Sequence, residues 1–374
     1  MSVPEPRKLA VFISFSGTGG VERMVLNLLP DIVNAGVKVD LLAIERYPTP
    51  ELKKLGDYGV RRIDLNVRHS SLAVPALMRY LRTSRPAALL AAKDRAIRAA
   101  VVARKLSGER ERVRLVGRLG THLSAALERK PAPLRWFRTG PMRLIYQGVD
   151  CVVANSEGVA EDTRRLTRLP DERVIVIRNP VVTPALDVLA QEPVMHPWFH
   201  TGAPPVILGA GRLTVQKDFS TLIRAFARVR VRRPCRLVIL GQGGLRSELE
   251  ALVQSLGVGD DVWMPGHVTN PYAFMAKAAV FALSSAWEGS PNVLTEALAV
   301  GTPSVATDCP SGPREILRGG EFGRLVPVGD AAALADAILT TLDRPLPGPV
   351  LRQAVAEYSC HVSARRYLEA LHLI

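Results

Sequence analysis

The chain has 374 residues, of which 47% are hydrophobic and 22% charged, and its formal net charge is +14. This length suggests two domains, and the charged fraction is typical of a globular protein. No apolar run reaches the ~20 residues that a membrane-spanning helix needs, and no export signal is evident at the N-terminus.

The first 182 residues alternate between strand-like and helix-like segments. Leu9–Phe15 is continuously apolar, which predicts a buried parallel strand, and an amphipathic helix is expected over about 21–35. Further strands are expected over 37–44, 87–91, 114–116, 151–155 and 174–177, with helices over 72–82, 95–106 and 156–167. This alternation predicts a doubly wound α/β domain over residues 1–182.

A second α/β series follows an interruption. Residues 183–204 are rich in proline and lack strong periodicity, which indicates an interdomain linker. Strands are then expected over 206–208, 236–240, 262–264, 279–283 and 304–307, with helices over 219–231, 245–256 and 292–300. We therefore predict a second Rossmann-like domain over 205–358, and a final amphipathic helix over about 359–374 that packs back on the first domain.

Two acidic residues flank an expected helix start in the second domain. Glu288 and Glu296 are separated by seven residues that include Gly289, Ser290 and Pro291. Ser290 suits an N-cap and Pro291 the first helical position, so the free backbone N–H groups of that turn would form an anion site suited to a diphosphate. Taken alone, the same pattern also fits a surface helix with solvated acids.

Glycines and cations follow the expected strand ends nearby. Gly211-Arg212 comes after the strand 206–208, with Lys217 five residues beyond Arg212, and Gly241-Gln242-Gly243 ends a later strand. Arg and Lys together can bring two positive charges to one phosphate group. Because ligands of open α/β sheets bind at the carboxyl ends of the strands, we expect these features to share one edge.

Six blocks of the second half, taken with the Glu288-x7-Glu296 spacing, resemble the family 4 glycosyltransferases. The blocks begin with Gly211-Arg212-Leu213 and end with Gly301-Thr302-Pro303 and the segment from Asp308 to Pro313, in the order of that family. The resemblance covers nearly the whole chain. It implies the GT-B fold, an α/β architecture of two Rossmann-like doubly wound domains facing each other across a cleft, with the acceptor in the first and the donor in the second.

The resemblance also implies roles for single residues. Arg212 and Lys217 would neutralise the departing diphosphate, and Glu288 would hold the sugar, which makes these three the expected catalytic residues. Glu296 would bind the ribose hydroxyls. The full set of expected donor-binding positions is Gly19, Gly20, Gly211, Gly241, Gly243, His267, Val268, Asn270, Gly289, Ser290, Pro291, Asn292, Val293 and Glu296.

The first domain offers less specific signals. Gly17-Thr18-Gly19-Gly20 resembles the first glycine loop of the family and would approach the donor phosphates or the acceptor. Arg118 and His122 follow an expected strand, where the family often has a polar or basic residue near the transferred sugar. For His122, an exposed loop histidine is the alternative.

All of the excess positive charge lies in residues 1–182, which hold 32 Lys and Arg against 18 Asp and Glu. Such asymmetry suggests a polyanionic partner, unless the arginines are simply spread over solvated faces. Within 127–145, the run Arg135-Trp136-Phe137-Arg138 combines cations with aromatics, which is typical of a surface that lies on anionic lipid. A helix packed on the domain by its aromatics is the alternative.

The resemblance implies a retaining glycosyltransferase that moves a hexose or N-acetylhexosamine, from a UDP-sugar by preference, to a glycan or lipid-linked acceptor of surface polysaccharide or lipopolysaccharide. No cofactor, metal or nucleic acid is expected. Four widely spaced cysteines without a C-x-x-C pair favour a cytoplasmic location, with possible docking on the inner face of the membrane. A hydrolase or epimerase of UDP-sugars, or a non-catalytic basic binder of membranes or nucleic acid, stays as an alternative.

Overall fold

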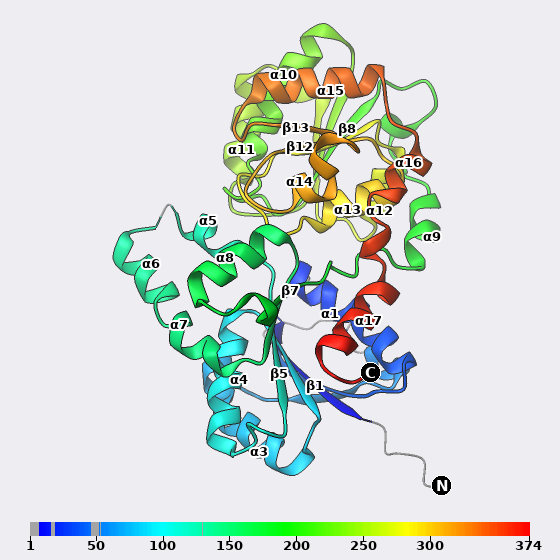
Figure 1. Cartoon of the computed structure of the whole chain (residues 1–374). Helices are drawn as coiled ribbons and strands as arrows, with labels where there is room; N and C mark the ends of the chain where they lie inside the picture. The colour runs from blue at the N-terminus through cyan, green and yellow to red at the C-terminus, as the bar shows by residue number, and fades with distance from the viewer. Residues whose placement is uncertain (1–6, 16–18, 46–51, 53, 129) are drawn as a thin grey trace. The chain divides into compact units, whose positions relative to one another are not determined.

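The computed structural model describes the whole chain apart from residues 1–6, 16–18, 46–51, 53 and 129. It consists of two compact units, which are described one at a time (Figure 1). The first unit contains Met1–Val181 together with Tyr358–Ile374, and the second contains Val182–Glu357.

The first unit is built on a parallel sheet of seven strands in the order β3-β2-β1-β4-β5-β6-β7. Its strands are β1 Lys8–Phe15, β2 Lys38–Glu45, β3 Arg61–Asp64, β4 Ala88–Ala92, β5 Arg114–Leu119, β6 Cys151–Ala154 and β7 Val174–Val176. The central strands are apolar along their length because both faces of the sheet are covered.

Helices cover the two faces of this first sheet. Leu9, Val11 and Ile13 of β1 pack toward α1 and the C-terminal helix, whereas Ala10 and Phe12 pack toward the opposite face with α3 and α4. The helices of the unit are α1 Gly20–Asn34, η1 Leu55–Tyr58, η2 Ser70–Ala73, α3 Val74–Ser84, α4 Asp94–Ser107, α5 Leu123–Leu127, α6 Ala132–Thr139, α7 Met142–Ile145, η3 Tyr146–Gly148, α8 Glu157–Thr167, η4 Asp171–Arg173 and α17 Cys360–Ala370.

The C-terminal helix α17 belongs to the first unit and lies beside α1 (Figure 1). Ser359 caps its start by accepting a hydrogen bond from Val362 N at 3.3 Å, and Arg114 of β5 donates to the carbonyl of Ala370 at 2.6 Å. Tyr367 and Leu368 of the helix are buried in the core under β1 and β4.

The second unit repeats the architecture with a parallel sheet of six strands in the order β10-β9-β8-β11-β12-β13. Its strands are β8 Val206–Ala210, β9 Arg236–Leu240, β10 Val262–Gly266, β11 Val280–Leu283, β12 Ser304–Thr307 and β13 Arg324–Val326. The core on one face joins these strands to α10, α11 and α15, with Phe226, Ile239 and Ile338 at its centre.

The remaining elements of the second unit are short, with the exception of α10 and α15. They are α9 Ala185–Gln191, η5 Pro197–Phe199, α10 Phe219–Arg232, α11 Arg246–Ser255, η6 Gly259–Asp261, α12 Pro271–Lys277, α13 Asn292–Ala299, α14 Pro313–Ile316, η7 Arg318–Gly320, α15 Ala331–Asp343 and α16 Gly348–Gln353; η8 Ala356–Tyr358 leads back to the first unit.

The expectation of a linker over residues 183–204 is wrong. This segment is part of the second unit and contains α9 and η5. The ring of His196 stacks on Trp263 of β10 with centroids 3.9 Å apart, and α9 packs against α12. Aromatic stacking of this kind holds the segment on the edge of the sheet, although its prolines suppress regular secondary structure.

Candidate functional site

The loops that follow the strands of the second sheet carry most of the expected site residues. Residues 211–217 follow β8, residues 241–243 follow β9, and residues 284–288 follow β11. The strands are parallel, so all three loops lie at one edge of the sheet. Strands β8 and β11 are neighbours although they are far apart in the chain, which places this edge at the point where the strand order reverses.

A buried ion pair joins two of these loops. Lys217 Nζ lies 2.5 Å from Glu288 Oε1, and the hydroxyl of Ser285 donates to the same carboxylate oxygen at 2.7 Å. The side chains of Lys217 and Glu288 are 14% and 8% exposed. The aliphatic part of Lys217 passes over Gly211, where a Cβ would lie 3.0 Å from the lysine chain. The pair is therefore packed as well as charged.

The loop carrying Lys217 is tied to the Glu288 loop through the backbone as well. Gln216 donates its side-chain amide to the carbonyl of Trp287 at 2.9 Å, and Ala286 N donates to the carbonyl of Gln216 at 2.8 Å. Ser284 donates to the carbonyl of Lys217 at 2.9 Å. These bonds hold the cation and the carboxylate in place without relying on the ion pair alone.

A thiol lies close to the same pair. Cys309 is 3% exposed, and burial together with the Glu288 carboxylate raises the pKa of its thiol to about 12. The thiol therefore stays protonated at neutral pH and acts as a small apolar side chain.

Glycine allows two of the loops to touch. Gly241 has φ +132°, and a Cβ there would lie 1.9 Å from the carbonyl oxygen of Gly211. A Cβ on Gly243 would lie 2.2 Å from the carbonyl oxygen of Leu213, whose N–H donates to Gln242 O at 2.9 Å. The structure thus gives Gly211, Gly241 and Gly243 a packing role that would also expose their backbone to a ligand.

The helix start expected at Ser290 and Pro291 is shifted by one residue. Helix α13 begins at Asn292, Pro291 occupies the N-cap position, and no side chain caps it. Ser290 is therefore not the cap, because its place is one residue too early. The segment from Gly289 to Pro291 is instead held by the loop that follows β12. Ser311 donates to the carbonyl of Gly289 at 2.8 Å, and Gly312, with φ +91°, packs so closely on Pro291 that a Cβ would not fit.

Glu296 lies on the fifth residue of α13 and is 1% exposed, while Asn292 and Val293 at the helix start are half-buried. Arg212 is exposed, and the structure gives it no ion-pair partner within the described part of the chain. The helix start, Arg212 and the Lys217–Glu288 pair are all carried by loops of the same sheet edge. This arrangement supplies positive charge and backbone donors together.

The expected donor contacts after β10 differ from one another. His267 is exposed and Val268 is half-buried. Asn270, however, caps α12 by accepting from Tyr272 N and Ala273 N, and donates its amide to the carbonyl of Leu189 at 2.7 Å. Asn270 thus caps α12 and also ties it to α9, and a donor contact of this residue stays a prediction.

The first unit places its glycine loop between β1 and α1. Gly20 is the first residue of α1, and Gly19 is the N-cap. Gly17 and Thr18 lie outside the described residues. A Cβ on Gly19 would lie 2.6 Å from Glu22 Oε2, so the turn into the helix is packed against this carboxylate.

Arg118 is held by contacts inside the first unit, and its expected substrate contact stays a prediction. Arg118 is 2% exposed, and its guanidinium donates to Asn179 Oδ1 at 2.7 Å. Burial lowers the pKa of Arg118. The hydroxyl of Tyr367, which is hydrogen-bonded to the guanidinium, raises the pKa and offsets only part of this effect. The side chain therefore joins β5 to α17 inside the first unit.

His122 is held by contacts within the same unit. Its Nδ1 accepts a hydrogen bond from Ala125 N at 3.3 Å at the start of α5 and lies 3.5 Å from Asp162. The side chain is 17% exposed. Hence His122 is a helix cap and not a freely exposed loop histidine, and a sugar contact stays a prediction.

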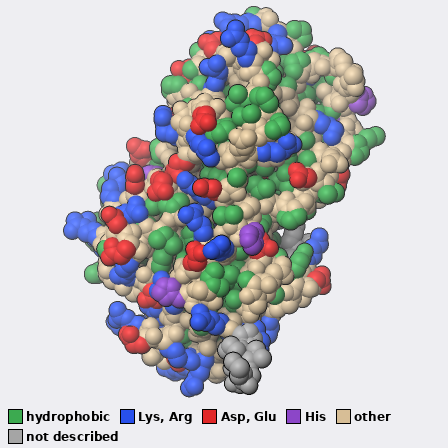
Figure 2. Space-filling model, turned by 45° about the vertical axis from the view of Figure 1, so that its right-hand side comes forward, with side chains coloured by type: hydrophobic (Ala, Val, Ile, Leu, Met, Phe, Trp, Pro, Cys, Tyr) green, Lys and Arg blue, Asp and Glu red, His purple; other side chains and the backbone are tan. Residues whose placement is uncertain are grey.

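Helix α6 projects the aromatic and basic side chains that the sequence singled out. Trp136 and Phe137 are 73% and 69% exposed, and Arg135 and Arg138 are exposed beside them. The packing of this helix by its aromatics, which was the alternative, is wrong because neither ring is buried. Elsewhere, Figure 2 shows Lys and Arg side chains interspersed with acidic and hydrophobic ones over the visible face.

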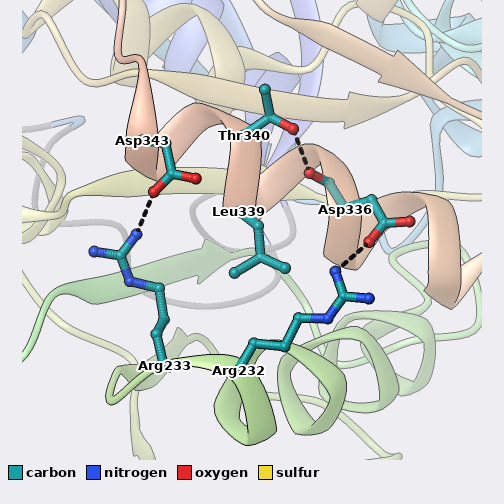
Figure 3. Close-up of a pocket in the computed structure, with 6 residues that line it drawn as sticks. All are labelled: Arg232, Arg233, Asp336, Leu339, Thr340 and Asp343. Atoms are coloured by element: carbon teal, nitrogen blue, oxygen red, sulfur yellow. Dashed lines mark hydrogen bonds and ion pairs between the residues drawn. The ribbon is translucent and has the colours of Figure 1, made fainter.

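A surface hollow of about 580 Å³ lies between α10 and α15 and is unrelated to this sheet edge. Figure 3 shows Arg232 and Arg233 reaching from α10 to Asp336 and Asp343 of α15, with nitrogen–oxygen distances of 3.1 and 2.9 Å. Both arginines lie before β9, at the amino ends of the strands, and both are neutralised. The hollow therefore has no free charge to offer an anion.

Two further observations bear on ligands and membranes. Over the described residues, no three His, Cys, Asp or Glu side chains cluster as a metal site would require. Nor does that part of the chain contain a helix with the length and apolar character needed to cross a bilayer.

The sequence did not point to four residues that hold the two strand-end loops in place. Ser285 and Gln216 act in the second unit, and Glu22 and Lys93 form an ion pair in the first. Ser285 precedes Glu288 by three residues just after a buried strand, which was an available local signal. Gln216 and Lys93 act through partners that are distant in the chain, so only the fold brings their contacts into view.

Comparison with known proteins follows the same division of the chain. Residues 18–183 match the family model described as Glycosyltransferase Family 4, and residues 204–344 match the model described as Glycosyl transferases group 1.

Two curated relatives illustrate the similarity. The N-acetylgalactosamine-N,N'-diacetylbacillosaminyl-diphospho-undecaprenol 4-alpha-N-acetylgalactosaminyltransferase of Campylobacter jejuni is 34% identical over 200 residues, which are 54% of this chain and 53% of the relative. The lipopolysaccharide core biosynthesis glycosyltransferase LpsE of Rhizobium meliloti is 36% identical over 200 residues, 53% of this chain and 56% of the relative. The chain thus spans about half the length of these relatives in the matches.

Solved structures resemble the chain over nearly all of its length. HepE of Anabaena, in complex with UDP and glucose, has a TM-score of 0.78 at 18% identity and covers 98% of this chain and 100% of its own. The outer core galactosyltransferase WaaB in its apo form has a TM-score of 0.74 at 20% identity, with 98% and 99% covered. At this level of identity the likeness concerns the fold, which is GT-B. The two family models, matched by residues 18–183 and 204–344, show that the chain belongs to the family 4 glycosyltransferases.

Proposed function

We propose that the protein transfers a hexose or N-acetylhexosamine from a nucleotide diphosphate sugar, with a UDP-sugar as the favoured donor, to a glycan or lipid-linked acceptor of surface polysaccharide. The observation that carries this proposal is the Lys217–Glu288 pair at the carboxyl ends of β8 and β11, next to exposed Arg212 and the start of α13.

The charges of this sheet edge suit a diphosphate. Lys217 is neutralised by Glu288, whereas Arg212 has no ion-pair partner among the described residues. We infer that the diphosphate binds Arg212 and Lys217 and that the first-turn N–H groups of α13, from Asn292 and Val293 onward, donate to its oxygens. Gly289, Ser290 and Pro291 would let the donor approach this turn closely.

Two carboxylates would then read hydroxyl groups. Glu288, held by Ser285 as well as by Lys217, stays in place when the lysine turns to a phosphate, and can accept hydrogen bonds from the sugar. We propose that Glu296 accepts from the ribose hydroxyls. Its 1% exposure means that the ribose must reach a nearly enclosed carboxylate at this edge.

Catalysis follows from the same charges. Breaking the bond between sugar and diphosphate leaves negative charge on the phosphate oxygens, and fixed cations stabilise that charge more strongly in the transition state than in the ground state. We propose that Arg212 and Lys217 supply this stabilisation without a metal ion. The acceptor would attack the face that the diphosphate leaves, a phosphate oxygen would take its proton, and the anomeric configuration would be retained.

The relatives guide the choice of donor and acceptor. HepE of Anabaena was solved with UDP and glucose, which favours a uridine donor here. The relative from Campylobacter jejuni is named for the transfer of N-acetylgalactosamine to a diphospho-undecaprenol-linked sugar, which favours a lipid-linked acceptor. Both choices are proposals for this chain.

We further propose that the enzyme works in the cytoplasm, with α6 resting on the inner face of the cell membrane. Trp136 and Phe137 are the exposed aromatics of this helix, and Arg135 and Arg138 flank them. Aromatic rings partition into the headgroup region while arginines attract anionic lipids. Such docking would bring the first unit to a lipid-linked acceptor.

The test is transfer from a panel of UDP-sugars to a synthetic polyprenyl-diphosphate-linked N-acetylhexosamine in detergent, with products identified by mass spectrometry and NMR. The proposal expects one donor to give a longer glycan with retained configuration, at an unchanged rate after chelation of divalent metals. Release of free sugar alone indicates a hydrolase, and an altered nucleotide sugar indicates an epimerase. Binding of no nucleotide sugar at all would contradict the proposal.

A further inference from the structure

Lys93 has an unusual backbone conformation at the carboxyl end of β4. Its φ and ψ are 80° and 146°, although it is not a glycine. Conformations of this kind are strained for a residue with a Cβ and persist only where the surrounding structure imposes them. Lys93 N donates to the carbonyl of Arg118 at 3.1 Å, and Ile97 N donates to the carbonyl of Lys93 at 3.1 Å. The backbone is therefore held on both sides.

The side chain of Lys93 joins two elements that flank the glycine turn. Its ammonium donates to the carbonyl of Ser14 in β1 at 2.8 Å and to Glu22 Oε1 in the first turn of α1 at 2.7 Å. The Glu22 side chain is 4% exposed and that of Lys93 is 32% exposed. A lysine with three donors thus uses two of them to connect the last residues of β1 with the start of α1.

Glu22 in turn sets the position of the helix start. Its carboxylate lies so close to Gly19 that a Cβ there would be 2.6 Å from Oε2. The first helical hydrogen bond of α1, from Arg23 N to the carbonyl of Gly19, measures 3.0 Å. Fixing Glu22 therefore fixes where Gly19 and the first turn of α1 can lie.

This clamp of Lys93, Glu22 and the Ser14 carbonyl lies at the reversal point of the first sheet. Strands β1 and β4 are neighbours, the chain leaves β1 toward β2 and leaves β4 toward β5, and α1 and α4 pack on opposite faces. Open α/β sheets bind ligands at the carboxyl ends of such a strand pair. In this protein the charged donor features are carried by the second unit.

We propose that Lys93 is a positioning residue for acceptor binding, which acts by clamping Glu22 so that the start of α1 is held in its binding conformation. This inference rests on the proposed glycosyltransferase activity, and it takes the acceptor, not the donor, as the ligand of Gly19 and Gly20, which the resemblance placed among the donor-binding positions. The backbone strain at Lys93 is the cost of directing its ammonium between two elements, and a residue needed only to complete strand β4 would not require it. The substrate class is the hydroxyl-bearing glycan acceptor.

The test compares Lys93→Met, Lys93→Arg, Glu22→Gln and the control Arg112→Met. Arg112 forms an ion pair with Glu109 in the same unit and is 43% exposed. The first readout is hydrogen exchange of the peptide over 21–25, measured beside the melting temperature. The second is KM for the lipid-linked acceptor and for the UDP-sugar of the assay above, together with UDP binding by calorimetry.

Lys93→Met is expected to raise exchange over 21–25 and to raise the acceptor KM about 10-fold or more, with UDP affinity and donor KM unchanged. Lys93→Arg keeps a cation at this position, so its exchange over 21–25 and its acceptor KM should stay near the wild-type values. Arg112→Met should change neither quantity. Unchanged exchange and unchanged acceptor KM in Lys93→Met would overturn the inference, as would a change of the donor KM alone.

If Lys93→Met does not fold, Glu22→Gln decides. This nearly isosteric change keeps an acceptor oxygen but removes the charge, so faster exchange over 21–25 and a higher acceptor KM are still expected, and wild-type values would overturn the inference. Wild-type protein that binds no nucleotide sugar would contradict the proposed function instead, and the exchange data would still judge the clamp.

Discussion

Replacing Lys217 by Met separates the two consequences of the Lys217–Glu288 pair, which are stability and donor binding. The change removes the ammonium that lies 2.5 Å from a carboxylate of 8% exposure, while Ser285 still donates to that carboxylate. Methionine keeps much of the aliphatic packing over Gly211. The expected losses are therefore electrostatic.

The magnitudes follow from burial and charge. Removing one partner of a fully buried pair costs about 3–5 kcal/mol, and here the remaining Ser285 bond and the 14% exposure of the lysine reduce the expected loss of unfolding free energy to about 2–3 kcal/mol. A charge-assisted hydrogen bond to a phosphate contributes about 1.5–3 kcal/mol, so the Kd for UDP should rise roughly 10- to 150-fold.

The double variant Lys217→Met/Glu288→Gln makes the test sharper. With no charge left unpaired in the interior, it should regain most of the lost stability but none of the lost UDP affinity. Urea unfolding gives the first quantity and calorimetry with UDP the second. Arg232→Met serves as control, because its pair with Asp336 is 65% and 66% exposed and lies at the opposite end of the strands; both measurements should stay near wild type. Wild-type UDP affinity in Lys217→Met, or its recovery in the double variant, would refute the reasoning.

Three further predictions concern other parts of the chain. Gly241→Ala should lower the unfolding free energy by about 2–4 kcal/mol, because φ is +132° and the new Cβ meets a neighbouring carbonyl. Gly244 has open space around it, so the unfolding free energy of Gly244→Ala should stay within about 0.5 kcal/mol of wild type in the same urea titration. Burial would raise the pKa of Asp40, but hydrogen bonds from Arg61 and Tyr80 outweigh it and hold the pKa below 3.8. The stability that this carboxylate contributes is thus present above its pKa in the unfolded chain and is lost as pH falls through its pKa in the folded protein. Arg61→Met should be less stable than wild type at pH 7, and the difference in unfolding free energy should shrink on acidification below pH 4. A constant difference would count against the reasoning. Trp136→Ser should weaken sedimentation with vesicles of anionic phospholipid at least several-fold without moving the melting temperature, since the ring is 73% exposed; equal sedimentation would contradict docking through α6.

Local pattern was sufficient to predict most of the strands, although not the short β3 and β13, and to place the candidate site residues of the second unit at one sheet edge. The continuous apolar run at Leu9–Phe15 predicts β1, which the structure extends by one residue to Lys8. Lys217 and Glu288 are 71 residues apart, yet their positions after strands of one open α/β sheet predicted that they share an edge, and the ion pair joins them. Parallel strands make such an inference possible, because their carboxyl ends lie at one side.

The structural roles that local sequence did not predict depend on contacts between distant segments. Arg118 follows a strand as a ligand-binding residue would, but Tyr367 of α17 covers it, and nothing near Arg118 in the sequence indicates that. Asn270 before Pro271 has the signature of a helix cap as much as of a binding residue. Residues 183–204 look like a linker because they are rich in proline and lack periodicity, while the stacking of His196 on Trp263 that holds the segment in place joins residues far apart in the chain.

The most direct test of the donor site is the melting temperature of the wild-type protein and of Glu288→Gln in the presence of a panel of nucleotide sugars. A donor that binds only the folded state raises the melting temperature. At a concentration of one hundred times its Kd, it adds about 2.7 kcal/mol to the free energy of unfolding. We expect one UDP-sugar to stabilise the wild type and to stabilise Glu288→Gln much less. If no nucleotide sugar shifts the wild type, or if the variant responds equally, the donor site does not lie at Lys217 and Glu288.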